Sequence, residues 1–396
     1  MSSAVRIYLD HNATAPLHPA AAATLGAHLA SGQPANPSSI HWAGRQARRT
    51  LGDSREHLAH LLGCTARALV FTASGTEANA LALRGSVAAA PPRRRRLLVS
   101  AIEHSSVLKT ADALAWERGD LVIERLPVTA DGRLDVGAAG ARLSDDVLLV
   151  SLMLANNETG VLQPVRELAL LARAHGIAVH CDVTQVLGRL PFALADTGAD
   201  LVSAGAHKFG GGLGTGFLVV TDGAPLSPLL PGHQENGRRG GTENVASIAA
   251  ATAALAAIVP SLTETAARTA ALRDHLERGL LAKIPGTTVN GAGATRLPNT
   301  TSLSFAGADG EAVLIALDVA GIAASSGAAC ASGTIEPSHV LLAMGQTRRA
   351  AGHAVRFSLG SSNTTADIEA VLAVMPDLVE AVRRSAAPPG AAATSE

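Results

Sequence analysis

Short runs of apolar residues recur along the first part of the chain, and stretches with helical spacing separate several of them. The runs are continuous rather than alternating with polar residues, which is typical of strands covered on both faces. They predict strands at 69–72, 97–100, 121–126, 147–152, 177–181, 200–204 and 216–221. Helical spacing predicts helices at 76–89, 105–118 and 164–175. This alternation indicates an α/β domain with a mostly parallel, seven-stranded sheet.

The order of elements changes after residue 245. Two Ala- and Leu-rich stretches predict long helices at about 246–259 and 262–283, and shorter strands and helices follow at 299–305, 310–320, 337–344, 354–359 and 365–383. This pattern predicts a smaller α+β domain. We expect a large domain over residues 14–255, a small domain made of residues 1–13 and 256–384, and a disordered tail over 385–396.

Composition narrows the class of protein. The chain has 396 residues, of which 47% are hydrophobic and 16% are charged, as in a well-buried globular enzyme. A net charge of −1 gives no general attraction to nucleic acid or to an anionic membrane, so we expect neither as a direct partner. The single basic cluster, Arg93–Arg96, follows two prolines and is interpreted as a solvated loop.

The sequence gives little indication of a secretory signal, a membrane span or a set of disulfides. The N-terminal stretch lacks the apolar core of a secretory signal, and no uninterrupted apolar run of about 18 residues predicts a membrane span. The three cysteines, Cys64, Cys181 and Cys330, are too few and too scattered for a disulfide framework. We therefore expect a reducing, cytoplasmic setting.

Lysine is rare in this chain. Only three of the 32 lysine and arginine residues are lysines, and one of them, Lys208, lies between a histidine and a glycine-rich run, in AHKFGGGLGTG. Schiff-base chemistry requires an amine that can lose its proton, a role that arginine cannot fill. A surface lysine on a flexible turn explains the same pattern, so Lys208 alone decides nothing.

Polar residues follow the carboxyl ends of the predicted strands, where open α/β sheets bind ligands. The turn TASGTEAN enters a helix and suits a phosphate, although an ordinary helix cap has the same composition. His104 either stacks on a flat ring or caps a helix. Asp182 follows a buried strand and needs a cationic partner, which a protonated pyridine nitrogen supplies. Together with Lys208, these features indicate pyridoxal phosphate.

With these motifs the sequence resembles the NifS/IscS-type cysteine desulfurases, in the class V aminotransferase group of fold-type I pyridoxal phosphate enzymes. The matching segments run from YLDHNATAP (8–16) to VRFSLG (355–360). Between them lie NPSSIHWAGR, FTASGTEAN, EHSSVL, NNETGVLQP, HCDVTQ, AHKFGG, NGRRGGTEN, LPNTTSLSF and SSGAACASGTIEPSHVLLAMG.

The resemblance implies a role for each matching residue. Lys208 is the expected Schiff-base lysine and the base for the Cα proton, and Asp182 is the expected partner of the pyridine nitrogen. The other expected cofactor contacts are His104 on the ring, Gln185 and Asn157 at the phenolic oxygen, and Gly75, Thr76 and His207 at the phosphate. Arg356 and Asn157 are expected at the substrate carboxylate. Thr242 is expected to reach the phosphate of a neighbouring subunit, which implies a homodimer with shared active sites.

Cys330 determines the reaction that the resemblance implies. It lies in SSGAACASG, a loop of small residues that we expect to be mobile and exposed. Its thiolate would take the sulfur of L-cysteine as a persulfide, release L-alanine, and pass the sulfur to an acceptor such as an iron–sulfur scaffold protein or to tRNA thiolation.

Two departures from the family pattern keep alternatives open. Gly205 stands where the family usually has a phosphate-binding serine, a role for which Ser203 is a possible substitute, and residues 211–214 read GGLG where GPKG is common. A selenocysteine lyase or another class V aminotransferase would have the same cofactor site. The departures also motivate a non-catalytic paralogue, although the retained Lys208, Asp182 and Cys330 argue against it.

Overall fold

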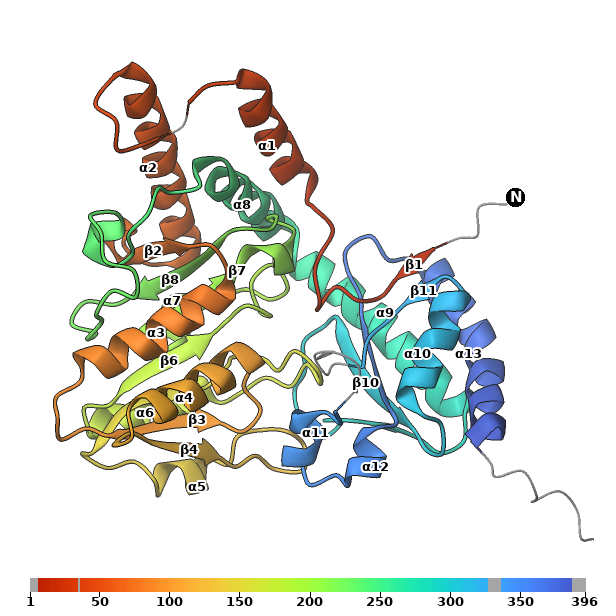
Figure 1. The fold of residues 1–396 in the computed structure, drawn as a ribbon. Coiled ribbons are helices and arrows are strands. Elements are labelled where there is room, and N and C mark those ends of the chain that lie inside the picture. Colours follow the sequence, from red (N-terminus) through yellow and green to blue (C-terminus); the bar gives the residue numbers. More distant parts are fainter. Residues whose placement is uncertain (1–5, 35, 327–335, 387–396) are drawn as a thin grey trace, which may run out of the picture.

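A mixed sheet of seven strands forms the centre of the larger part of the molecule (Figure 1). The computed structural model describes residues 6–34, 36–326 and 336–386. The strands are β2 (Leu69–Thr72), β3 (Arg96–Ser100), β4 (Val122–Leu126), β5 (Val147–Ser151), β6 (Ala178–Asp182), β7 (Leu201–Gly205) and β8 (Gly216–Val220), in the order β2-β8-β7-β6-β5-β3-β4. Only β8 runs antiparallel to its neighbours β2 and β7. The predicted α/β class and all seven predicted strands are confirmed.

Helices cover both faces of this sheet, which explains the continuous apolar strands. On one face α3 (Gly75–Ala89) and α4 (Ser105–Glu117) pack on Val70, Val99 and Leu218. On the other face α2 (Trp42–Leu62), α6 (Val165–Ala174) and α8 (Val245–Ile258) pack on the alternate strand residues, such as Leu69 and Val150. The short helices α5 (Val136–Gly140) and α7 (Leu194–Thr197) lie in the connections.

The prediction missed the helices before the first strand of this sheet. They are α1 (Pro19–Ser31) and α2, and both pack against α8. In α2 the buried residues Ala43, Ala47, Leu51, Leu58 and Leu62 form a helical stripe, so the periodic signal was present in the sequence. In α1 only Ala21 is buried, and its alanine-rich sequence has no clear apolar face.

The smaller part has its own core. An antiparallel sheet in the order β12-β10-β9 comprises β9 (Thr287–Val289), β10 (Thr300–Phe305) and β12 (Ala354–Ser358), and β1 (Ile7–Tyr8) pairs in parallel with β11 (Ile322–Ala323). Helices α9 (Leu262–Lys283), α10 (Gly310–Val319) and α13 (Thr365–Ala386) enclose residues such as Phe305 and Phe357. Two short helices, α11 (His339–Ala343) and α12 (Arg348–Ala351), complete this part. The domain boundaries drawn from the sequence stay a prediction.

Two predictions about local structure need correction. Helix α13 continues to Ala386, so the first two residues of the expected tail are helical, and residues 387–396 lie outside the described ranges. The basic cluster is not simply a solvated loop. Arg94 donates to the carbonyls of Val147 and Gly176, and Arg96 belongs to β3 and pairs with Glu124. Arg94 and Arg96 therefore connect the start of β3 to neighbouring elements of the sheet.

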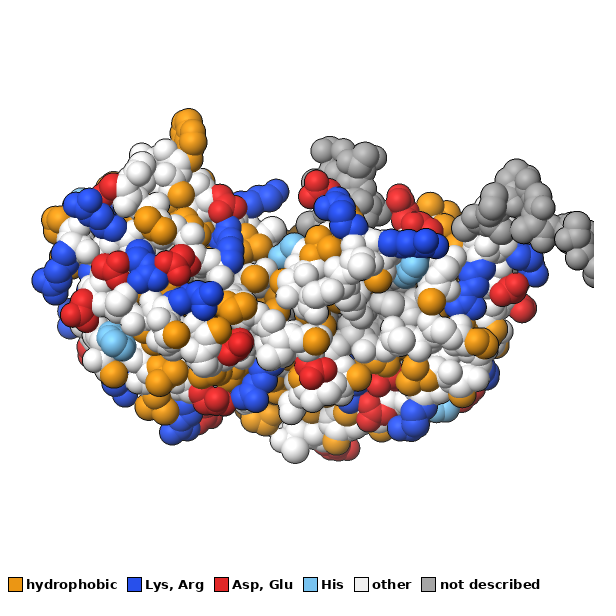
Figure 2. Space-filling view, turned by 90° about the horizontal axis from the view of Figure 1, so that it is seen from below, with side chains coloured by type: hydrophobic (Ala, Val, Ile, Leu, Met, Phe, Trp, Pro, Cys, Tyr) orange, Lys and Arg blue, Asp and Glu red, His pale blue; other side chains and the backbone are white. Residues whose placement is uncertain are grey.

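One helical stretch, Val245–Lys283, is long and apolar enough to cross a membrane by length and composition alone. The core helix of a soluble protein passes the same test. Here α8 packs against α1 and α2, and α9 packs against α13. On the face that Figure 2 shows, acidic and basic side chains are interspersed, with no large area of one sign.

Candidate active site

A cavity of about 740 Å³ lies where the carboxyl ends of the parallel strands meet the smaller part of the molecule. The residues that line it come from the turns after β2, β3, β5, β6 and β7 and the helices that follow some of them. Others come from the smaller part of the molecule and the N-terminal segment: Asn12, Ala13, Ser325, Glu336, Pro337, His339 and Arg356 of β12. Nine predicted site residues line this cavity: Gly75, Thr76, His104, Asn157, Asp182, Gln185, His207, Lys208 and Arg356. Thr242 is exposed and is not among the lining residues, and Cys330 lies outside the described residues.

Lys208 lies in the short 3₁₀ turn η2 (Ala206–Phe209) directly after β7. The turn ends at Gly210 with φ 79°, and a Cβ there would lie 2.7 Å from the carbonyl oxygen of Pro16, so glycine is required. The Nζ atom donates to the carbonyls of Asn12 and Ala13, at 2.7 Å each. Burial, and then the nearby arginine charges, lower the pKa of Lys208 to about 8. The amine is therefore closer to the nucleophilic free base than an exposed lysine.

Asp182 ends β6 and is only 7% exposed. Its Oδ2 atom accepts a hydrogen bond from Asn79 Nδ2 at 2.8 Å, and Oδ1 accepts from the backbone N–H of Thr184 at 2.9 Å. Within the described part of the chain no lysine or arginine forms an ion pair with it. The cationic partner that a buried carboxylate needs is thus left to a ligand, as the sequence predicted, and a protonated pyridine nitrogen fits this position.

Asn79 connects Asp182 to His104, a link that the sequence prediction missed. The second N–H of its Nδ2 donates to Ser106 Oγ at 2.9 Å, and Ser106 Oγ lies 2.7 Å from His104 Nδ1. The backbone N–H of Ser106 also donates to Nδ1, so Nδ1 is an acceptor and a neutral ring carries its proton on Nε2. Burial lowers the pKa of His104, which favours this neutral form. His104 therefore caps α4 and also lines the cavity, so the helix-cap interpretation is confirmed and stacking on a flat ring stays a prediction.

A chain of buried groups supports Asn79 from behind. Ser203 Oγ donates to Asn79 Oδ1, so it accepts from His180 Nε2 at 2.9 Å, and His180 Nδ1 accepts from Ser151 at 2.8 Å. Burial lowers the pKa of His180 to about 4, so the ring is neutral. Ser203 is fully occupied in this chain and does not line the cavity, so it does not substitute for the serine missing at Gly205.

At the expected phosphate-binding end of the cavity, the backbone at Gly75 lies close to the backbone at Gly205. A Cβ on Gly75 would lie 3.2 Å from the Gly205 nitrogen and 3.4 Å from Thr184 Oγ1. Gly75 begins the 15-residue helix α3, whose N-terminal N–H groups and dipole suit an anion. Burial lowers the pKa of His207 to about 4, so it contacts this region as a neutral ring. The chemistry of this end fits a phosphate.

Arg356 is 4% exposed and already pairs with an acidic residue. Its Nη2 atom donates to Asp10 Oδ1 at 2.6 Å, and Nη1 donates to the carbonyl of Asn157 at 3.0 Å. Its Nε–H is buried and has no partner among the described residues. A substrate carboxylate would meet an arginine that Asp10 holds in place. The family motif predicts Arg356, whereas no sequence signal connected it to Asp10.

Neither described cysteine is a reactive thiol. Cys181 lies in β6 and is fully buried, and burial raises its pKa well above the usual value, as expected for a structural residue. Burial raises the pKa of Cys64 to about 11. Among the described residues no group of three or more His, Cys, Asp or Glu side chains is arranged to hold a metal ion.

The comparisons with known proteins agree with this geometry. The model of the family Aminotransferase class-V matches residues 7–371. A cysteine desulfurase of Cereibacter sphaeroides is 44% identical over 96% of this chain and 97% of its own length. An IscS-like cysteine desulfurase of Mycobacterium tuberculosis is 40% identical over 96% of this chain and 98% of its own length. A solved NifS-like protein covers 95% of this chain and 100% of its own, at 31% identity and a TM-score of 0.88.

The chain therefore belongs to the class-V aminotransferase family, within its group of NifS/IscS-like cysteine desulfurases. Members of this family use pyridoxal phosphate. The resemblance noted in the sequence is confirmed over nearly the full length of the chain.

Proposed function

We propose that this protein is a cysteine desulfurase that binds pyridoxal phosphate in the cavity between Asp182 and Lys208. One observation carries the proposal: a buried carboxylate without a cationic partner and a lysine with a lowered pKa line the same cavity. The backbone cradle at Gly75 and Gly205 supports the position of the phosphate. When bound, pyridoxal phosphate supplies an electron sink for negative charge at the substrate Cα.

The residues of the chain have separate tasks in this reaction. Arg356 and Asn157 hold the carboxylate of L-cysteine and so orient its Cα–H bond toward Lys208. Lys208 Nζ takes the Cα proton and later returns it. Its pKa of about 8 lies close to neutral pH, where proton transfer in both directions is fast. The side chain of Asn79 and the backbone N–H of Thr184 donate to the Asp182 carboxyl group and hold it in place.

The sulfur is transferred to Cys330. Its thiolate attacks the substrate sulfur, an S–S bond forms as the substrate Cβ–S bond breaks, and the electron pair of the broken bond stays with carbon. Protonation of Cβ then gives L-alanine, and Cys330 carries a persulfide. A thiol reductant or an acceptor protein takes the outer sulfur. The role of Cys330 rests on the family motif SSGAACASG.

A homodimer with shared active sites is part of the proposal. Thr242 is exposed and lies away from the cavity of its own chain, which suits a contact with a neighbouring subunit. The segment before it is anchored by Glu235, whose carboxylate pairs with Arg55 at 2.6 Å and accepts from the backbone N–H of Phe71 at 2.8 Å. We further propose a cytoplasmic enzyme that passes sulfur to iron–sulfur cluster assembly or tRNA thiolation.

The three lysines offer a direct test of the cofactor position. The protein is incubated with pyridoxal phosphate and reduced with borohydride, which makes the bond between an amine and the aldehyde permanent, and the labelled peptide is identified by mass spectrometry. Label on Lys208 supports the proposal. Label on Lys109, which lines the same cavity, or on Lys283, which does not, would contradict it. Lys208→Met is the matched control and is expected to remain unlabelled.

Substrate preference is tested by kcat/KM for L-cysteine and L-selenocysteine side by side. Turnover of L-cysteine to equal amounts of sulfide and L-alanine supports the desulfurase. Turnover confined to L-selenocysteine would identify a selenocysteine lyase instead.

A further inference from the structure

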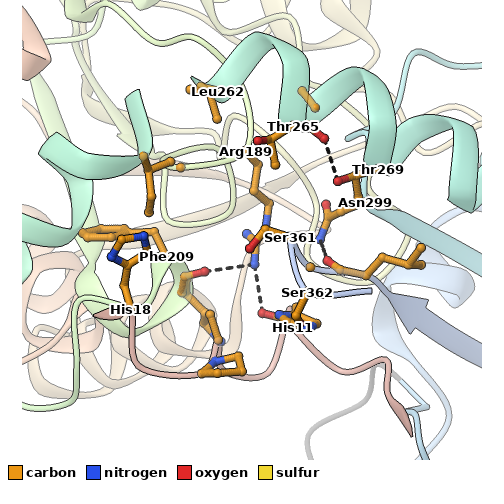
Figure 3. A pocket seen from close by; sticks show the side chains of 18 of the residues that line it. His11, His18, Arg189, Phe209, Leu262, Thr265, Thr269, Asn299, Ser361 and Ser362 are labelled. Carbon is orange, nitrogen blue, oxygen red and sulfur yellow. Dashed lines mark hydrogen bonds between the residues drawn. The ribbon is translucent and has the colours of Figure 1, made fainter. Parts of the chain in front are cut away.

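Arg189 is a buried arginine with no acidic partner among the described residues. It is 9% exposed and lies in the loop that follows β6. Its side chain lines a second cavity of about 440 Å³, together with residues such as His11, His18 and Phe209 (Figure 3). A buried charge without a counter-ion is costly, and a neutral residue would fill this position at lower free energy. A structural role alone therefore gives no reason for arginine here.

The hydrogen bonds of Arg189 go to two candidate site residues, Gln185 and Lys208, and to His11 in the turn that follows β1. Nη1 donates to the carbonyl and to the side-chain Oε1 of Gln185, and Nη2 donates to the carbonyls of His11 at 2.9 Å and Lys208 at 3.3 Å. Figure 3 shows the guanidinium reaching toward His11. A single planar group thus connects Gln185 to the turn that carries Lys208.

These contacts leave one possible orientation for the Gln185 amide. The guanidinium only donates, so Oε1 must face Arg189. On the other side, Nε2 lies 3.1 Å from the carbonyl oxygen of Asn12, which only accepts. A flipped amide would place N–H groups against the guanidinium and an oxygen against a carbonyl. Nε2 therefore keeps one further N–H, and Gln185 lines the candidate site.

The carbonyl of Asn12 also accepts the hydrogen bond of Lys208 Nζ at 2.7 Å. The side chains of Gln185 and Lys208 therefore donate to the same carbonyl oxygen, and Arg189 donates to Gln185 and to the backbone carbonyl of Lys208. The positive charge of Arg189 lies close enough to act on Lys208 as well, in the same direction as burial.

We propose that Arg189 is a positioning residue, which fixes the Gln185 amide and the Lys208 turn so that one N–H of Gln185 is presented to the phenolic oxygen of the bound cofactor. The inference rests on the proposed function, because it assigns that N–H to the cofactor. It goes beyond the family motifs, none of which assigns a role to this arginine. Arginine suits the position because its planar fork reaches Gln185 and two backbone carbonyls together.

Three variants of the cofactor-loaded protein test the proposal. Arg189→Met removes the charge and the fork, Arg189→Lys keeps the charge and loses the fork, and Gln185→Leu removes the positioned amide. Arg268→Met is the matched control, since Arg268 also donates to two backbone carbonyls but lines neither cavity. The readouts are the pH midpoint of the change in the visible spectrum, kcat and KM for L-cysteine, and thermal unfolding.

We expect Arg189→Met to raise the spectral midpoint, because a positive charge and a fixed donor are both lost near the Lys208 nitrogen. Arg189→Lys keeps the charge and loses only the fixed donor, so we expect a smaller rise of the midpoint than in Arg189→Met. Its kcat should fall about tenfold, which corresponds to roughly one hydrogen bond. Arg268→Met should leave both values unchanged. The other charged or titratable groups that interact with Lys208 are unchanged in the parent and in all four variants: Asp10, His104, Asp182, His207 and Arg356.

A double-mutant cycle separates positioning from general stability. In the Gln185→Leu background, Arg189→Lys should lower kcat by less than it does in the parent, because only the contact with the Lys208 turn is left to lose. An equal loss in both backgrounds would overturn the proposal, as would a parent-like midpoint and kcat in Arg189→Met. If Arg189→Met does not fold, the cycle with Arg189→Lys gives the answer. Absence of any product from the parent would refute the proposed function instead, and the spectral midpoints would still test Arg189.

Discussion

Replacing Asn79 with alanine tests the buried hydrogen-bond chain beneath the candidate site. Asn79 is 2% exposed; it donates to Asp182 and Ser106 and accepts from Ser203. Alanine removes all three bonds and leaves a small cavity. Each of the three partners keeps one other hydrogen bond, to Thr184, His104 and His180 respectively. The free-energy cost of the lost hydrogen bond at each partner therefore lies near the low end of the usual range of about 1–3 kcal/mol.

At about 1 kcal/mol for each orphaned group, plus the lost packing, we expect Asn79→Ala to lower the free energy of unfolding by about 3–5 kcal/mol. Affinity for pyridoxal phosphate should fall as well, because Asp182 loses a donor that holds its side chain in place. Urea unfolding of the cofactor-free protein gives the first value, and titration with the cofactor gives the second.

Ser86→Ala is the matched control on the same helix. Ser86 is also 2% exposed, but its hydroxyl has no hydrogen-bond partner in the described part of the chain. Removing it should change the free energy of unfolding by less than about 0.5 kcal/mol. The reasoning fails if Asn79→Ala lies within about 1 kcal/mol of the parent, or if Ser86→Ala is equally destabilising.

Three further changes follow from the same geometry. The pKa of Lys208 is about 8 in the folded protein and 10.5 in an ordinary lysine, so between these pH values the unfolded chain binds more protons than the folded protein. The free energy of unfolding of the cofactor-free protein should therefore rise with pH in this range. Lys208→Met should lack this rise, and an identical slope in both proteins would contradict the lowered pKa. Glu235→Ala removes the ion-pair partner of the Arg55 guanidinium, so the free energy of unfolding should fall by about 3–5 kcal/mol in urea or thermal unfolding. A loss below about 1 kcal/mol would show that the fold does not depend on this pair. Gly205→Ser places a hydroxyl beside the expected phosphate site, so we expect about tenfold tighter cofactor binding. The new Cβ would lie 3.3 Å from the Gly75 nitrogen, so the free energy of unfolding should fall by about 1 kcal/mol. Weaker cofactor binding would refute the interpretation that Gly205 costs the site a phosphate contact.

The sequence predicted those parts of the fold that depend on local pattern. Inner strands of the large sheet such as β5 and β8 are continuous apolar runs, so their positions follow from burial on both faces. The edge strand β4 contains Glu124 and Arg125 and is only partly buried. The site residues at the strand ends, such as Lys208 and Asp182, were predictable because the carboxyl ends of parallel strands share one edge of a sheet. Helix α1 was not predictable in this way because its alanines carry no periodic signal.

The supporting residues could not be predicted because their partners are distant in the sequence. Asn79 contacts Asp182 across 103 positions, and Arg356 contacts Asp10 across 346. Arg189 contacts His11 across 178 positions and Lys208 across 19, and only the folded chain brings these two carbonyls to its guanidinium. The solvated-loop interpretation of Arg93–Arg96 holds for the exposed Arg93 and Arg95 but was wrong for Arg94 and Arg96, since their partners lie on other elements.

The most direct measurement is the yield of sulfide and L-alanine from L-cysteine and a thiol reductant, made for the parent and for Cys330→Ala. Cysteine desulfurization through Cys330 predicts equal amounts of both products from the parent and loss of sulfide in the variant. Sulfide and alanine formed at the parent rate by Cys330→Ala would contradict it and would indicate a lyase that bypasses this cysteine. Cofactor-loaded parent protein that forms neither product would contradict it as well.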